Sequence, residues 1–95
     1  MPRKKYPANI AGPKIRKMRK KLGLTQDAFA ARCQLAGLDI SRSTLGQIEA
    51  RLRRISDEEL IVLAALLGVA TDDLYPEEIV RRLRNKRLTS HHAKD

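Results

Sequence analysis

Two segments decide the fold of this chain: TQDAFA at residues 25–30 and SRSTLGQIE at residues 41–49. Each opens with a hydroxyl side chain, on Thr25 or Ser41, that can accept a hydrogen bond from the free backbone N–H groups of a first helical turn. Asp27 adds a negative charge where the helix dipole favours one. The two segments therefore predict two capped helices in close succession.

Start and stop signals for further helices flank these segments. Pro13 suits the first turn of a helix that Gly23 ends. Ser56 and Glu59 have the spacing of a capping box, in which each side chain bonds the backbone N–H of the other residue, and this helix ends at Gly68. The sequence thus predicts a helix on each side of the two central ones.

The C-terminal part of the chain continues the helical pattern. A short turn runs from Thr71 or Asp72 to Tyr75, and Pro76 then opens a last helix that extends to residue 88. No segment alternates polar and apolar residues with the period of a strand. The sequence therefore predicts an all-α fold, and 95 residues leave room for one small domain.

Composition divides the chain into four parts. Residues 1–9 contain two prolines, three basic side chains and, besides Met1, Tyr6 as the one large apolar group, which predicts a flexible basic arm. The helical domain takes residues 10–75, and residues 76–88 form the C-terminal helix. Residues 89–95 are expected to be a disordered polar tail, in which two histidines lack the neighbours that a metal site needs.

The formal net charge of +9 is unevenly distributed. Residues 1–24 contain nine Lys or Arg and no acid, whereas residues 56–80 contain seven acids and no Lys or Arg. We expect an anionic partner on the N-terminal side of the domain, with the acidic segment facing away from it. Aromatic residues make up 3% of the chain, which argues against binding of single strands by base stacking.

Several other functions are not expected from this composition. The longest apolar run, Leu60 to Ala70, is about half of the ~20 residues that a membrane span requires, and the N-terminus has no apolar targeting segment. The single cysteine, Cys33, excludes an internal disulfide and is expected in the core of a cytoplasmic protein. No nucleophile–base pair or phosphate-cradling glycine loop is present, so neither enzyme activity nor a cofactor or metal is expected.

The helix predicted over residues 42–51 has two unlike sides. Leu45, Ile48 and Leu52 form one apolar stripe that should be buried. The opposite side is small and polar, with Ser43, Gly46, Gln47 and Ala50 flanked by Arg42 and Arg51. Such a side can approach a major groove closely and bond base edges. Gly46 costs about 1 kcal/mol relative to Ala in a helix, so we expect either nucleic acid or a neighbouring protein element to approach it.

Two charged residues lie on or beside apolar stripes. Arg19 shares a stripe with Ile15, Met18 and Leu22, and Glu49 lies between the buried and polar sides of its helix. Leaving one member of a buried ion pair alone costs about 3–5 kcal/mol. We therefore predict that Arg19 and Glu49 pair and brace the two helices, the alternative being two independent surface charges.

The chain resembles the helix-turn-helix domains of phage repressor and Cro type, also called the xenobiotic-response-element family. The resemblance covers about residues 10–75 and is carried by six short segments: Ile15-Arg16-Lys17-Met18-Arg19, Gly23-Leu24-Thr25-Gln26, Ala30, Ser41-Arg42-Ser43-Thr44-Leu45, Ile48-Glu49 and Leu66-Leu67-Gly68-Val69. It implies a compact five-helix bundle whose third helix lies in the major groove of double-stranded DNA. It also implies a prokaryotic or phage transcriptional regulator, typically a repressor that binds operators as a homodimer.

The resemblance also implies roles for individual residues. Arg42, Ser43 and Gln47 would contact bases, and Arg53 and Arg54 would contact the phosphate backbone. Gln26 would clamp a phosphate, which its place beside the free N–H groups of a helix start supports. Further candidates for backbone contact are Lys14, Arg16, Thr44 and Arg51. The arm at Arg3, Lys4 and Lys5 would either follow a groove or only aid solubility.

Two features depart from the family pattern. Residues 34–39 lengthen the connection between the second and third helices, so the second helix is a turn longer or its loop bulges. Ala50 and Arg51 stand where the family favours Asn-Gly, and without that glycine the third helix is expected to run toward Arg53.

The helix over residues 57–67 is apolar nearly all round, which a small monomer cannot easily bury. Either the last helix covers its second side or a second subunit does, and the latter predicts a homodimer through residues 61–83. The favoured function is sequence-specific binding of double-stranded DNA in the nucleoid. The alternative is a protein-interaction module, such as an antitoxin or adaptor, for which DNA contact is secondary.

Overall fold

The computed structural model describes residues 9–94, and the side chains of residues 9–86. Its helical elements are α1 (Gly12–Lys21), α2 (Gln26–Leu35), α3 (Arg42–Glu49), α4 (Asp57–Leu67), the 3-10 helix η1 (Thr71–Leu74) and α5 (Glu77–Lys94). This part of the chain contains no strand, so the predicted all-α fold is confirmed. No helix within it combines the length and apolar character needed to cross a bilayer.

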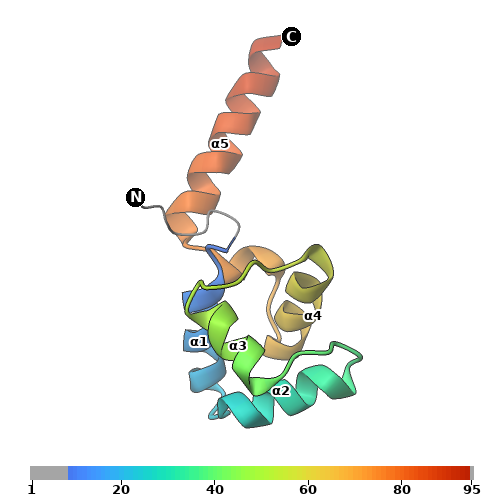
Figure 1. The fold of residues 1–95 in the computed structure, drawn as a ribbon. Coiled ribbons are helices and arrows are strands. Elements are labelled where there is room, and N and C mark those ends of the chain that lie inside the picture. Colours follow the sequence, from blue (N-terminus) through green and yellow to red (C-terminus); the bar gives the residue numbers. More distant parts are fainter. Residues whose placement is uncertain (1–8, 95) are drawn as a thin grey trace, which may run out of the picture.

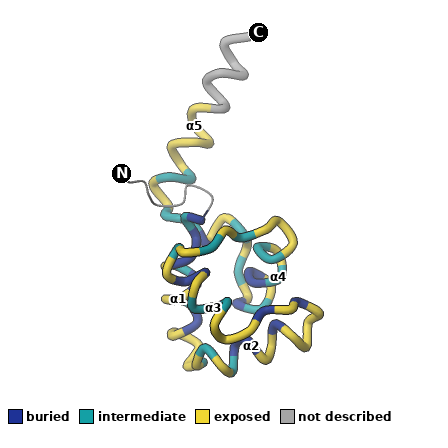
Figure 2. Tube along the Cα trace, in the orientation of Figure 1, coloured by how far each residue is buried: buried dark blue, intermediate teal, exposed yellow. Residues whose placement is uncertain are grey.

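The first four helices and η1 pack around one core, and α5 extends away from this body (Figure 1). Every element of the body contributes to the core, which includes the fully buried Ile15, Phe29, Cys33, Leu45, Ile48, Leu63 and Leu74. Figure 2 shows the buried residues on the inner sides of the body and mostly exposed residues along α5 up to residue 86. Burial raises the pKa of the Cys33 thiol, as the predicted core position requires.

Side-chain caps begin three of the helices where the sequence predicts them. Thr25 Oγ1 accepts a hydrogen bond of 3.0 Å from the Ala28 N–H, and Ser41 Oγ accepts one of 3.1 Å from Thr44. At the start of α4, Ser56 and Glu59 form the complete capping box. These caps fix the starts of α2, α3 and α4.

The predicted extension of the third helix toward Arg53 is wrong, because α3 ends at Glu49. Arg51 adopts a left-handed φ of +63° and so turns the chain without the family's glycine. The Leu52 N–H then bonds the Gln47 carbonyl at 2.8 Å, which closes the end of the helix. Leu52 consequently leaves the predicted apolar stripe and is 68% exposed. Leu22, also predicted on a buried stripe, follows the end of α1 and is 51% exposed.

Of the additional residues 34–39, the first two belong to α2, which ends at Leu35, and the other four belong to the connection. Gly37 turns the chain with a φ of +88°, and Leu38 and Ile40 then return to the core. Gln34 donates a hydrogen bond of 3.0 Å to the Ile40 carbonyl across this connection. The connection is therefore held by two buried side chains and by a hydrogen bond from the end of α2.

Both predicted ends of the domain need correction. Asn9, predicted in the flexible arm, is 1% exposed, and its amide donates to the carbonyls of Ile48 and Arg53, both at 2.8 Å. It therefore belongs to the body, and the predicted arm residues Arg3, Lys4 and Lys5 lie outside the described residues. At the other end α5 continues to Lys94, so the predicted helix end at residue 88 is too early.

Candidate nucleic-acid interface

The two sides of α3 differ as the sequence predicts. Leu45 and Ile48 are fully buried, whereas Ser43 and Gln47 are exposed on the opposite side. Thr44, at the flank, is half-buried, and its hydroxyl lies 3.0 Å from that of Ser41. The body therefore leaves the hydroxyl and amide groups of α3 open to a partner.

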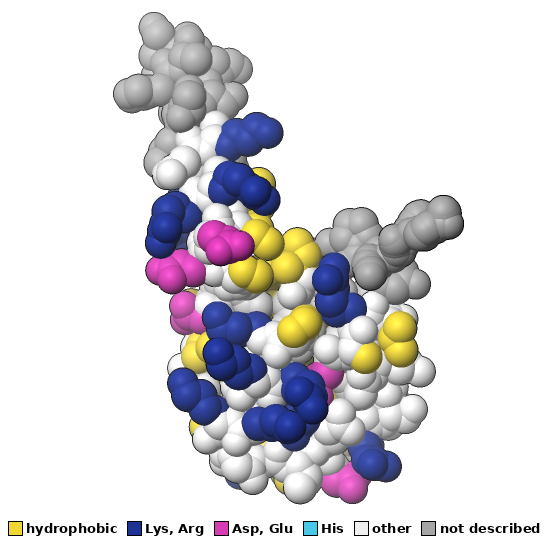
Figure 3. Space-filling model, turned by 90° about the vertical axis from the view of Figure 1, so that its left-hand side faces the viewer, with side chains coloured by type: hydrophobic (Ala, Val, Ile, Leu, Met, Phe, Trp, Pro, Cys, Tyr) yellow, Lys and Arg dark blue, Asp and Glu magenta, His cyan; other side chains and the backbone are white. Residues whose placement is uncertain are grey.

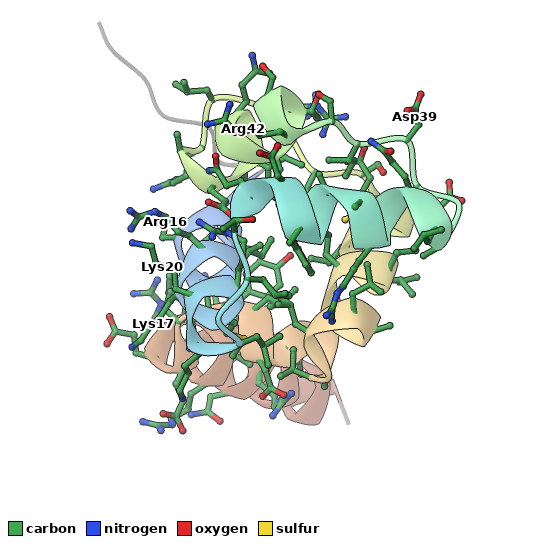
Figure 4. All side chains as sticks on the ribbon, turned by 90° about the horizontal axis from the view of Figure 1, so that it is seen from below. Arg16, Lys17, Lys20, Asp39 and Arg42 are labelled. Carbon is green, nitrogen blue, oxygen red and sulfur yellow. The ribbon has the colours of Figure 1, made fainter. Side chains whose placement is uncertain are left out.

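Arg42 stands at the first residue of α3, close to the first turn of α2 (Figure 4). Its Nε lies 3.7 Å from Asp27 Oδ1, and the two side chains are 67% and 78% exposed. An exposed pair at this distance contributes little free energy. The guanidinium can thus exchange Asp27 for another acceptor at low cost.

The predicted pair of Arg19 and Glu49 is present and buried. Arg19 Nε lies 2.7 Å from Glu49 Oε2, and Arg19 Nη2 lies 3.0 Å from Oε1. Arg19 Nη1 also donates a 2.7 Å hydrogen bond to the carbonyl of Leu24, just before α2. One guanidinium therefore joins α1, the start of α2 and the end of α3.

Gln26, the first residue of α2, extends its side chain over α3. Its Nε2 donates a hydrogen bond of 3.0 Å to Glu49 Oε1. A β-carbon added at Gly46 would lie 3.6 Å from this nitrogen and 3.8 Å from Gln26 Oε1. The neighbour of Gly46 in the free protein is thus a protein side chain, which was one of the two expected alternatives.

The start of α1 approaches the end of α3 more closely than any sequence signal indicates. A β-carbon added at Gly12 would overlap with the Ile48 carbonyl oxygen and lie 3.2 Å from the Glu49 carbonyl oxygen. Asn9 Oδ1 accepts a hydrogen bond of 2.9 Å from the Gly12 N–H. Gly12 therefore lets two helix ends meet backbone to backbone.

Two of the arginines predicted to contact the phosphate backbone contact the protein itself. Arg53 makes two hydrogen bonds to Glu59, at 3.0 and 2.8 Å, and a third of 2.9 Å to the Arg54 carbonyl. The Arg53 hydrogen bonds lower the pKa of the Glu59 carboxyl and raise the pKa of Arg53. Arg51 Nε donates a hydrogen bond of 2.7 Å to the Asn9 carbonyl. Arg54 is exposed.

A basic surface covers the outer side of α1. Arg16, Lys17 and Lys20 point away from the other helices, and Asp39 lies on the opposite side of the molecule (Figure 4). Lys14, on the same helix, is half-buried. Figure 3 shows Lys and Arg side chains gathered over this side of the body and along α5. The basic side chains of α1 thus lie together on one side of the body.

Part of the acidic segment is neutralised by α5 and by the segment after α3. Arg84 pairs with Asp72, and Arg81 lies 3.5 Å from Glu77 one helical turn earlier. Together with the pair of Arg53 and Glu59, these contacts connect acids of the 56–80 segment to basic neighbours. The positive charge on the outer side of α1 has no such acids on its own helix.

Comparison with known proteins identifies the class to which this architecture belongs. The helix-turn-helix family model matches residues 15–74, which is more than half of the chain. The chain belongs to this family, the helix-turn-helix proteins of phage-repressor and Cro type, whose members are DNA-binding regulators.

A solved structure agrees with this assignment. The chain is similar to a hypothetical transcription factor, NHTF, from Neisseria, with a TM-score of 0.62 and 25% sequence identity. The match covers 87% of this chain and 95% of that one. No curated protein matches the sequence.

Proposed function

We propose that this protein binds specific sequences of double-stranded DNA and acts as a transcriptional repressor in a prokaryote or phage. The observation that carries the proposal is the open polar side of α3, where Ser43 and Gln47 are exposed opposite the buried Leu45 and Ile48. A helix with this distribution can enter a major groove while its apolar side stays in the core.

The proposed base contacts come from Arg42, Ser43 and Gln47. These side chains supply guanidinium, hydroxyl and amide groups, which read base edges by hydrogen bonds. Among the described residues, Arg42 at the start of α3 pairs with Asp27 alone, through an exposed contact, so it can turn to a guanine. Occupation of an operator by this face would then block access to the same DNA.

The proposed backbone contacts surround this face. Gln26 at the start of α2 and Thr44 beside the base-reading residues would bond phosphates, and Arg54 would add a charge beyond α3. The basic side chains of α1, including Lys14 and Arg16, would extend the contact. Arg51 and Arg53 would act indirectly, because their contacts with Asn9 and Glu59 fix the segment that carries Arg54.

We further propose that the protein works as a homodimer formed through residues 61–83 in the cytoplasm. Ile61 on α4 is 62% exposed and Leu83 on α5 is 53% exposed. A second subunit would cover such side chains and place two copies of α3 in half-sites about one DNA turn apart.

Selection of bound sequences from a random DNA pool at moderate salt tests the function. We expect a recurring operator with two related half-sites. Gln47→Ala and Ser43→Ala should each reduce discrimination between bases by about 1–3 kcal/mol, whereas Arg54→Ala should weaken binding to all sequences and lower the salt slope by about one. Equal weakening on all DNA by every variant would show that α3 does not read bases.

The exposed Ile61 and Leu83 support a second candidate function, a protein-interaction module such as an antitoxin or adaptor. In that case the chain would form a stable complex with a different protein through residues 61–83. Recovery of such a complex, together with no preference among DNA sequences at physiological salt, would favour this function over the first.

A further inference from the structure

Gln26 is held in a defined position before any DNA is present. The Glu49 carboxylate is fixed by two hydrogen bonds from Arg19, of 2.7 and 3.0 Å, inside the body. Its Oε1 also accepts the 3.0 Å hydrogen bond from Gln26 Nε2. The amide is therefore attached to a buried, charged anchor, and hydrogen bonds to charged groups are stronger than those between neutral groups.

The same anchor fixes the backbone that carries Gln26. Arg19 Nη1 donates a 2.7 Å hydrogen bond to the carbonyl of Leu24, two residues before Gln26. Gly46 lies next to the amide, and a β-carbon added at Gly46 would be in ordinary van der Waals contact with it. Backbone and side chain of Gln26 are thus both set by one buried ion pair, on the side of α3 that carries Gln47.

The bond to Glu49 determines what remains of the amide for a partner. A glutamine amide has two hydrogens on Nε2, and one of them points at Glu49. No residue in the described part of the chain accepts the second hydrogen. Because the carboxylate is only an acceptor, the amide must turn its nitrogen toward Glu49. If the amide flipped, its oxygen would face the carboxylate oxygen, and two acceptors would repel each other.

We propose that Glu49 is a positioning residue for DNA binding, which orients the Gln26 amide so that its second hydrogen points at a phosphate. This inference rests on the proposed function. Preorganisation of this kind lowers the free-energy cost of ordering a flexible side chain when the complex forms. The buried pair of Arg19 and Glu49 therefore serves binding as well as stability.

Shortening the side chain separates the amide from its anchor. Gln26→Asn keeps the amide group but removes one methylene, so the amide cannot reach Glu49 and a phosphate together. We expect both Gln26→Asn and Gln26→Ala to weaken binding of the selected operator by about tenfold, measured by fluorescence anisotropy with the whole chain. Leu35→Ala, at the far end of α2 where Leu35 is 89% exposed, is the control and should keep the parent affinity.

Glu49→Gln tests the anchor directly. It should weaken operator binding in the parent chain but cause no further loss in the Gln26→Ala background, whereas a purely structural role would cause the same loss in both. Melting temperatures establish that each variant is folded. If Glu49→Gln does not fold, the two Gln26 variants decide. Equal losses of affinity from Gln26→Asn and Gln26→Ala support the inference, and parent affinity in Gln26→Asn contradicts it.

Three results would overturn the inference: parent affinity in Gln26→Asn, parent affinity in Gln26→Ala, or equal losses from Glu49→Gln in both backgrounds. Each leaves the proposed function intact if the parent chain prefers its selected operator. A parent chain without any sequence preference would instead overturn the proposed function, and the inference with it.

Discussion

The two ends of α3 are held in different ways. At the C-terminal end, the Ile48 carbonyl accepts a hydrogen bond from Asn9, and the Glu49 carboxylate is buried against Arg19. At the N-terminal end, a hydroxyl cap at Ser41 and the exposed pair of Arg42 and Asp27 face solvent. The polar side-chain contacts of α3 are therefore buried and strong at its C-terminal end, the rigid end, and exposed and weak at its N-terminal end, the loose end.

This asymmetry suits a helix that reads DNA. In helix-turn-helix proteins the N-terminal residues of the recognition helix contact base edges. Side chains there must leave water or weak partners when they meet bases, and exposed contacts are given up at little cost. The strong contacts at the other end keep the helix axis in place while this exchange occurs.

The largest effect is expected at the rigid end. Arg19→Ala leaves the Glu49 carboxylate buried without its partner, so the free energy of unfolding should fall by about 3–5 kcal/mol. Urea denaturation monitored by circular dichroism measures this change. Arg16→Ala, on the exposed side of the same helix, is the control and should stay within about 0.5 kcal/mol of the parent. Similar losses of stability from both variants would show that the buried ion pair contributes no more than an exposed side chain of the same helix.

A second test compares two glycines at contacts of α3: Gly12 on α1, which faces the end of α3, and Gly46 on α3 itself, which faces Gln26. Gly12→Ala would force the β-carbon into the Ile48 carbonyl, so we expect a loss of about 1–3 kcal/mol in the free energy of unfolding. Gly46→Ala adds a β-carbon at ordinary contact distance from Gln26 and should gain up to about 1 kcal/mol from helix propensity. Equal effects in thermal unfolding would contradict the close approach at Gly12.

The segment that follows the rigid end should show a pH dependence. Hydrogen bonds from Arg53 lower the pKa of Glu59 below its ordinary value of 4.5. A lowered carboxyl pKa stabilises the fold at pH values above 4.5, and this stability is lost as the pH falls through the lowered pKa. Melting temperatures between pH 7 and pH 2.5 measure the loss. In Glu59→Gln the corresponding part of the pH dependence should disappear, and an unchanged profile would disprove the role of this bridge.

The smallest effect on stability is expected at the loose end. Arg42→Ala removes only an exposed pair, so the free energy of unfolding should change by less than about 0.5 kcal/mol. Discrimination between the selected operator and a sequence with one changed base should nevertheless fall by about 1–3 kcal/mol. Arg32→Ala, exposed near the end of α2, serves as the control. A large loss of stability in Arg42→Ala would mean that this end of α3 is not loose.

The sequence predicts the features of the fold that depend on one helix at a time. Thr25, Ser41 and Ser56 are caps because their side chains act on the N–H groups of the next turn. The helical period likewise places Leu45 and Ile48 in the core and exposes Ser43 and Gln47. Local rules suffice where the partners lie within four residues.

Features that depend on how separate helices meet could not be read in this way. Asn9 is polar and precedes the first helix, so composition assigns it to the arm, yet its partners lie at Ile48 and Arg53. Glu59 caps its own helix and also binds Arg53, and only the first role follows from spacing. The pair of Arg19 and Glu49 is the exception, because two charges beside apolar stripes leave few other partners.

Asn9 also bears on where this domain begins. The family match starts at residue 15, whereas the amide that satisfies the Ile48 and Arg53 carbonyls lies earlier in the chain. A fragment trimmed to the matched segment would keep every residue of α3 that we propose to contact DNA but expose these carbonyls to water. The folded body therefore extends at least six residues further toward the N-terminus than the matched segment, to the buried amide of Asn9.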